Sequence, residues 1–189
     1  MSGHNGRKYS STVWDDLEEL LAASDERRGR ANIDASLQLC ETFNLFSELV
    51  DRMSKAPLRR RGTIAWILAR AAQQKKWMPL EKEAEKLIDR LPDEEDIMAK
   101  RCTIDIFQYS PIPESREALM TDICIAFIRD PKEPIAIRAF SITVLFRIIQ
   151  NYPELYQEVR AMMEELSEHE KGSIRIRVRK ALELMEGLI

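Results

Sequence analysis

Apolar residues recur three and four positions apart along almost the whole chain, which is the spacing that places them on one face of an α-helix. Short turns containing proline, Gly-Ser or several acids separate these stretches, and no segment alternates apolar and polar residues as a strand would. The pattern predicts ten helices in five pairs, over about 12–21, 24–40, 43–55, 58–74, 79–91, 93–109, 114–129, 134–151, 153–166 and 174–188. We expect Thr12 and Asp93 to cap two of them.

The stretch from Pro131 to Gln150 is a prolyl turn followed by a helix that is apolar on nearly every side. A helix of this kind must be buried between neighbours. The opening of this helix, which contains Arg138, recurs as an imperfect repeat elsewhere in the chain. The arginines of all its occurrences fall at positions 30, 61, 101, 138 and 179. A period near forty residues with two helices per unit is typical of helical repeats, in which stacked pairs bury a continuous core.

At Asp130-Pro131 and Ile137-Arg138-Ala139 the chain resembles a HEAT or armadillo-type repeat protein. The resemblance implies an all-α, right-handed superhelix of about five helix pairs. It also implies that the second, arginine-bearing helix of each pair lies on the concave surface. We expect residues 11–189 to form one such domain after a loose lead-in over residues 1–10.

The last third of the chain, through Ala139–Phe146 and Tyr152–Leu155, is similar to short bacterial HEAT-like proteins, some of which carry the label adenylosuccinate lyase. The lyase loop Gly-Ser-Ser-x-Met-Pro is missing, because Gly172-Ser173 is followed by Ile174-Arg175. An assay for fumarate release would test the lyase label.

Composition limits the function classes. With 32 acids against 29 bases the net charge is −3, whereas a general polyanion binder is usually strongly basic. The cysteines, three in number and far apart, lie within apolar helical patterns and are expected to be reduced core thiols. The first ten residues contain no apolar segment typical of a secretory signal, and no apolar run is long enough to span a bilayer. We therefore expect a cytoplasmic location.

Catalytic chemistry has few candidate residues. His4 lies in the lead-in and His169 lies among glutamates at a helix end, so both are expected to be solvated. The sequence contains no phosphate-binding glycine loop and no Cys/His spacing typical of a metal site. These observations predict that the chain is not an enzyme and uses no cofactor or metal.

The recurring arginines have two interpretations. An acid follows four residues later in the pairs Arg30/Asp34, Arg101/Asp105 and Arg179/Glu183, which is a spacing that favours ion pairs on one helix. The structural interpretation, which we prefer, is that the arginines join successive repeats through carboxylates and loop carbonyls. The functional interpretation is a row of cations along the concave groove. Arg61 and Arg138 have no acid four residues on, and are expected to be the freer pair.

A run of eight basic residues without an acid, from Arg52 to Lys76, contains Trp66 and is followed by Trp77. Basic residues with interleaved aromatics can bind nucleic acid, and HEAT-like DNA-alkylation repair proteins are a precedent. A solvated helix face with Trp66 in the core is the other interpretation. The candidate partner-binding residues are Arg59, Arg60, Arg61, Trp66, Arg70, Arg101 and Arg138.

Curved helical solenoids present extended concave surfaces, and no catalytic constellation competes with that use. We therefore expect a scaffold or interaction protein that holds a protein or peptide partner in its groove. The alternative is nucleic-acid binding through residues 52–76. Because Gly187-Leu188-Ile189 provides little polar cover, we also expect self-association through the C-terminal repeat.

Overall fold

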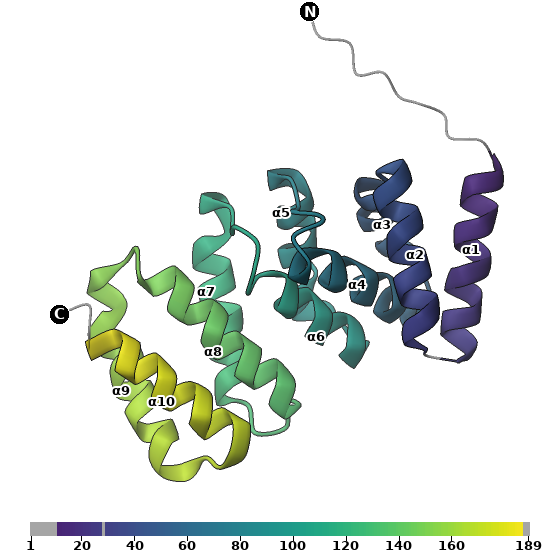
Figure 1. Ribbon diagram of the computed structural model, residues 1–189. Helices are drawn as coiled ribbons and strands as arrows, with labels where there is room; N and C mark the ends of the chain where they lie inside the picture. Colours follow the sequence, from purple (N-terminus) through teal and green to yellow (C-terminus); the bar gives the residue numbers. More distant parts are fainter. Residues whose placement is uncertain (1–10, 28, 187–189) are drawn as a thin grey trace, which may run out of the picture.

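The computed structural model describes residues 11–27 and 29–186, and within these ranges the secondary structure is entirely helical (Figure 1). The ten α-helices are α1 (Ser11–Glu26), α2 (Arg30–Phe43), α3 (Phe46–Met53), α4 (Leu58–Gln73), α5 (Glu81–Asp89), α6 (Ile97–Ile106), α7 (Glu114–Arg129), α8 (Ile135–Ile149), α9 (Tyr156–His169) and α10 (Gly172–Glu186). Two 3₁₀ turns, η1 (Leu91–Asp93) and η2 (Pro153–Leu155), precede α6 and α9. The predicted all-α fold of ten helices is confirmed for this part of the chain.

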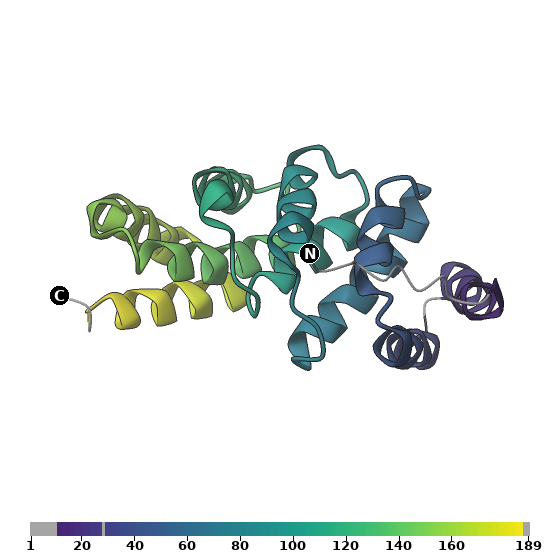
Figure 2. The ribbon, with the colours of Figure 1, turned by 90° about the horizontal axis from the view of Figure 1, so that it is seen from above.

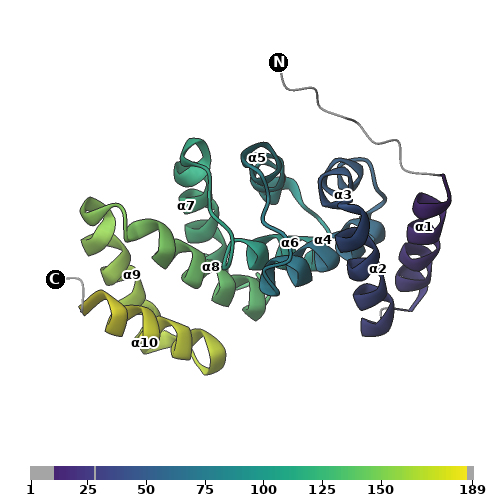
Figure 3. The same ribbon diagram turned by 45° about the horizontal axis from the view of Figure 1, so that its top comes forward.

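The helices stack as successive pairs in two rows (Figure 3). The second helices α2, α4, α6, α8 and α10 contact one another in order, and so do the first helices α3, α5 and α7. The pair α1–α2 and the pair α9–α10 lie at opposite ends of the stack (Figure 2). The molecule is arched, and the row of second helices lies on the inner side of the arch. We call the solvent-facing side of this row the inner surface.

The core is one continuous apolar cluster that runs from α1 to α10. Helix α8 buries ten of its fifteen residues, as expected for a helix packed on several sides, and one of the ten is Arg138. No helix in the described part of the chain has both the length and the apolar character that crossing a bilayer requires.

Three predicted helix boundaries were wrong. Helix α1 runs from Ser11 without a break to Glu26, so Thr12 lies inside it and no new helix starts at Ser24. Ser24 is buried at 1% exposure, which suits a helical contact position better than a turn. Asp93 ends η1, and α6 is capped instead by Asp96, whose carboxylate accepts a hydrogen bond from the backbone N–H of Ala99 at 2.8 Å.

Candidate functional site

A chain of side-chain contacts runs along the inner surface from α2 to α10. Arg70 on α4 reaches Asp34 on α2 at 3.4 Å, and Gln73, also on α4, donates to Asp105 on α6 at 2.7 Å. The chain continues through Gln108, which follows α6, to Thr143 and Arg177. We call the seven residues the inner row: Asp34, Arg70, Gln73, Asp105, Gln108, Thr143 and Arg177. The inner row links all five second helices.

Arg177 is the inner-row residue that joins the most distant parts of the sequence. From α10 its Nη1 donates to Gln108 Oε1 at 3.0 Å and to Thr143 Oγ1 at 2.5 Å. The guanidinium also lies 5.3 Å from the ring centroid of Phe140 on α8, within the range of a cation–π contact. The contacts of this one cation therefore fix the positions of α8 and α10 relative to the end of α6.

Asp105 is the acid at the centre of the inner row and is only 8% exposed. Its two carboxylate oxygens accept separate hydrogen bonds, from Gln73 at 2.7 Å and from Gln108 at 2.5 Å. Burial raises the pKa of Asp105 above its usual value, although the two glutamine hydrogen bonds and the charges of Arg101 and Arg177 oppose the rise. Because its oxygens are already bonded, Asp105 positions the two amides.

A cavity of about 390 Å³ opens between α8 and α10 beside Arg177. Its lining is apolar apart from Thr143, Arg177 and Lys180: the residues are Ile142, Thr143, Phe146, Ile176, Arg177, Lys180, Ala181 and Leu184. Leu184 is 47% exposed at the rim. The volume falls within the range of about 300–1,000 Å³ that is usual for ligand-binding pockets. The cavity can receive an apolar side chain, with two cations at its edge for a carboxylate.

A second series of contacts joins the N-terminal turns of the second helices. Arg61 on α4 lies 3.5 Å from Glu94, which precedes α6, and Lys100 on α6 lies 2.7 Å from Glu133, which precedes α8. Arg138 on α8 forms an ion pair with Glu170, which precedes α10. In each case a cation of one repeat binds an acid just before the next second helix. The structural interpretation of the recurring arginines is confirmed for Arg61 and Arg138.

The expectation that Arg61 and Arg138 are the freer pair was wrong. Arg138 is only 7% exposed, and its Nε donates to the backbone carbonyl of Ile128 at 3.0 Å. The Nε of Arg61 donates to the carbonyl of Ala56 at 2.9 Å. Both arginines lack an acid four residues on because their carboxylate partners belong to the next repeat.

The three predicted i,i+4 ion pairs have different outcomes. Arg30 and Asp34 do pair, at 3.4 Å and with largely exposed side chains. Arg101 instead contacts Met98 Sδ at 3.0 Å, and Asp105 is bonded to the two glutamines. Arg179 and Glu183, which are both exposed and both within the described residues, form no ion pair. In the third repeat, Lys100 forms the ion pair with the next repeat. In the second and fourth repeats an arginine, Arg61 or Arg138, forms the corresponding pair.

The basic run at 52–76 is largely matched by acids from the first helix pair. Arg60 contacts Glu18 and Asp25, each at 2.5 Å, and Arg52 contacts Glu18 at 3.3 Å. Lys76 pairs with Glu41 at 2.7 Å, Arg70 pairs with Asp34 as described above, and the exposed Arg59 donates to the carbonyl of Glu26 at 3.2 Å. Five of the eight cations therefore join α1 and α2 to α3, to α4 and to the turn after α4.

The aromatic side chains of this region lie in or against the core. Trp66 is half-buried and packs on the apolar cluster. Trp77 is 8% exposed and stacks on Phe46, with 5.6 Å between ring centroids. Neither ring stands free beside the cations, which is the arrangement that base stacking would need.

The sequence did not indicate a site role for Gln73, Gln108, Thr143 or Arg177. The two glutamines are separated by 108 − 73 = 35 residues, and Thr143 follows Gln108 after another 143 − 108 = 35. This interval is close to one repeat, so a search for uncharged polar residues in register would have found three of the four. The role of Arg177 depends on the arch and carries no local signal.

Other reactive groups do not form a second site in the described part of the chain. Among those residues no group of His, Cys, Asp and Glu could hold a metal ion. Cys40, Cys102 and Cys124 are free and buried, and burial raises their pKa values to about 12, about 11 and about 12. His169 is exposed at the end of α9, and His4 lies outside the described residues.

Stacked helix pairs, a continuous core and contacts repeated from pair to pair define an all-α solenoid built from helical repeats. A comparison with protein-family models agrees, because the HEAT repeat domain matches residues 23–185. The chain belongs to the HEAT repeat family. No curated protein and no solved structure matches it.

Proposed function

We propose that this chain is a non-enzymatic protein-binding module that holds a segment of a partner protein on its inner surface. The observation that carries the proposal is the cavity between α8 and α10, which joins an apolar lining to the cations of Arg177 and Lys180. Curved repeat proteins use their extended concave surfaces for binding. The cytoplasmic location expected from the sequence stays a prediction.

The shape and charge of the cavity indicate what the partner segment contains. Phe146, Ala181 and Leu184 offer an apolar surface to one bulky side chain. Arg177 is held by Gln108 and Thr143, so it is preorganised for a carboxylate beside that side chain and loses little freedom on binding. The fitting ligand is a helix or extended segment with an apolar residue next to an acid.

The experiment compares three immobilised proteins exposed to a lysate of the source cells: the wild type, Leu184→Glu and Leu80→Glu. Leu184 lies at the cavity rim, whereas Leu80 precedes α5 in the other row and is 68% exposed, so it is a matched control. We expect one protein to be retained by the wild type and by Leu80→Glu and to be lost with Leu184→Glu. Retention of the same proteins on all three would contradict the proposal.

The partner identified in this way is then titrated against the same variants. Fully burying an exposed leucine is worth about 1.5–3 kcal/mol, and Leu184 is 47% exposed, so a bound partner gains about half of that value from it. Because about 1.4 kcal/mol corresponds to a factor of ten, Leu184→Glu should weaken binding about three- to tenfold. Retention of the wild type on DNA at low salt, lost as salt is raised, would instead favour the nucleic-acid alternative.

A further inference from the structure

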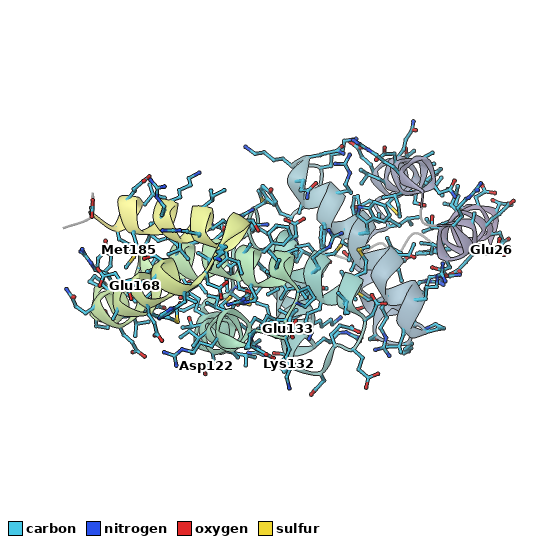
Figure 4. The ribbon with its side chains drawn as sticks, turned by 90° about the horizontal axis from the view of Figure 1, so that it is seen from below. Glu26, Asp122, Lys132, Glu133, Glu168 and Met185 are labelled. Atoms are coloured by element: carbon cyan, nitrogen blue, oxygen red, sulfur yellow. The ribbon has the colours of Figure 1, made fainter. Side chains whose placement is uncertain are left out.

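The first and last helices, α1 and α10, carry opposite charges, and among the described residues no further helix pair packs on either end of the stack. Helix α1 contains six acids and no base, whereas α10 contains four bases and two acids. Figure 4 labels Glu26 on α1 and Met185 on α10 at opposite ends of the molecule. Inside the stack every second helix has another second helix on both sides, but α2 has none before it and α10 has none after it.

The N-terminal end contains an open groove of about 660 Å³ between α1 and α2. Its lining is mainly apolar and includes two acids, one amide and one hydroxyl: Asp16, Glu19, Leu20, Ala23, Ala35, Gln38, Leu39, Thr42 and Phe43. The groove faces away from the stack, because α1 and α2 turn other residues toward α4, among them Asp25 to Arg60 and Asp34 to Arg70.

The C-terminal end presents a face of matching character on α10. Away from its buried residues α10 exposes the cations Arg175, Arg179 and Lys180, with Glu183 as one acid among them. Ile176 projects from this face with 68% of its surface exposed. An exposed aliphatic side chain surrounded by cations complements an apolar groove whose exposed rim residues include Asp16 and Glu19.

We propose that the groove between α1 and α2 binds α10 of a second copy of this chain, so that copies associate head to tail. The contact gives α2 a preceding second helix and gives α10 a following one, which continues the packing already present inside each molecule. It is heterologous, since two different surfaces meet, and a heterologous contact that does not close into a ring adds further copies. The α10 face shares Ile176 and Lys180 with the lining of the cavity between α8 and α10. The groove lies outside the inner surface, and Arg175 and Arg179 do not line the cavity, so substitutions at those two arginines test this contact apart from the inner-surface partner.

The test is sedimentation velocity of the full chain over a range of concentrations up to about 1 mM, at low salt and at about 1 M salt. We expect the weight-average mass of the wild type to rise above the 22.0 kDa of one chain at low salt and to fall back as salt screens the ends. The same measurement is made on a chain that lacks residues 1–10. If both proteins keep the mass of one chain at every concentration and salt, the proposal is overturned.

Charge reversal separates this contact from other modes of association. The head variant Asp16→Lys/Glu19→Lys and the tail variant Arg175→Glu/Arg179→Glu should each stay monomeric. The variant that combines all four substitutions restores opposite charges at the two ends, and it should associate again. Glu48→Lys/Asp122→Lys, on α3 and α7, is the matched control and should behave like the wild type. Association of the head and tail variants at the wild-type level, or a monomeric combined variant that keeps its helical circular dichroism, would also overturn the proposal.

Discussion

Replacing Arg138 by alanine tests whether the recurring arginines hold the repeats together. Arg138 is 7% exposed, and it binds the carbonyl of Ile128 in its own pair and the carboxylate of Glu170 before α10. Alanine favours helix, so the substitution costs nothing through helix propensity. The change therefore reports the loss of these two contacts.

The magnitude follows from burial. Removing one member of a buried ion pair costs about 3–5 kcal/mol, and a hydrogen bond to a charged group contributes about 1.5–3 kcal/mol. The side chain of Glu170 is 25% exposed, so water can solvate it after the change, and we take the lower end of the range. We expect Arg138→Ala to lower the free energy of unfolding by about 3 kcal/mol, or Tm by about 6–12 °C for a chain of this size.

The assay is urea denaturation followed by helical circular dichroism, with Arg30→Ala as the control. Arg30 has a side chain that is 74% exposed, and its pair with Asp34 is a surface i,i+4 contact worth about 0.2–0.5 kcal/mol. A double-mutant cycle with Glu170→Ala isolates the ion pair from the Ile128 carbonyl bond. If Arg138→Ala lies within about 1 kcal/mol of the wild type, the inter-repeat role of this arginine is refuted.

Three further predictions concern the inner row, one close helix contact and the thiols. Folding raises the pKa of Asp105, so the folded chain binds this proton more tightly than the unfolded chain does. The wild type should therefore gain stability relative to Asp105→Asn as the pH falls from 7 toward about 4. Urea titrations of both proteins at the two pH values measure this difference, and a relative loss of stability would contradict the prediction. Gly62→Ala should lower Tm despite the better helix propensity, since a Cβ there would lie 2.5 Å from Asp96 Oδ1 and 3.1 Å from Met98 Cβ; an increase in Tm would show that Asp96 moves aside without cost. All three cysteines should resist a thiol reagent in the folded protein and react once it is unfolded, as counted by absorbance; rapid native labelling would contradict the buried placement.

The sequence predicted the solenoid because its evidence is periodic. Apolar spacing located ten helices, and the arginine phrase located the repeat. Helix ends were predicted less accurately than helix positions. Ser24-Asp25-Glu26 has the composition of a helix cap but lies inside α1, where Asp25 accepts hydrogen bonds from Arg60 and Thr63. A contact from another repeat decided that boundary, and local composition does not report such contacts.

The candidate site was predicted less well, because side chains in a stack pair with partners about one repeat length away in the sequence. Partners of Arg61, Lys100 and Arg138 are 32 or 33 residues away in the sequence. The i,i+4 rule therefore found the weak surface pair of Arg30 and missed the buried pair of Arg138. Arg101 and Lys100 differ by one position, which turns a side chain by about 100° around the helix. That turn decides which cation reaches the next repeat.

The central claim is that the inner surface between α8 and α10 holds a partner protein, and photocrosslinking in the source cells tests it most directly. A photoreactive phenylalanine analogue placed at Leu184 lies at the cavity rim, and the same analogue at Leu80 lies in the other row. The account predicts a discrete crosslinked protein from position 184 that is absent from position 80. Crosslinks from position 80 to the same protein, or none from position 184, would contradict it.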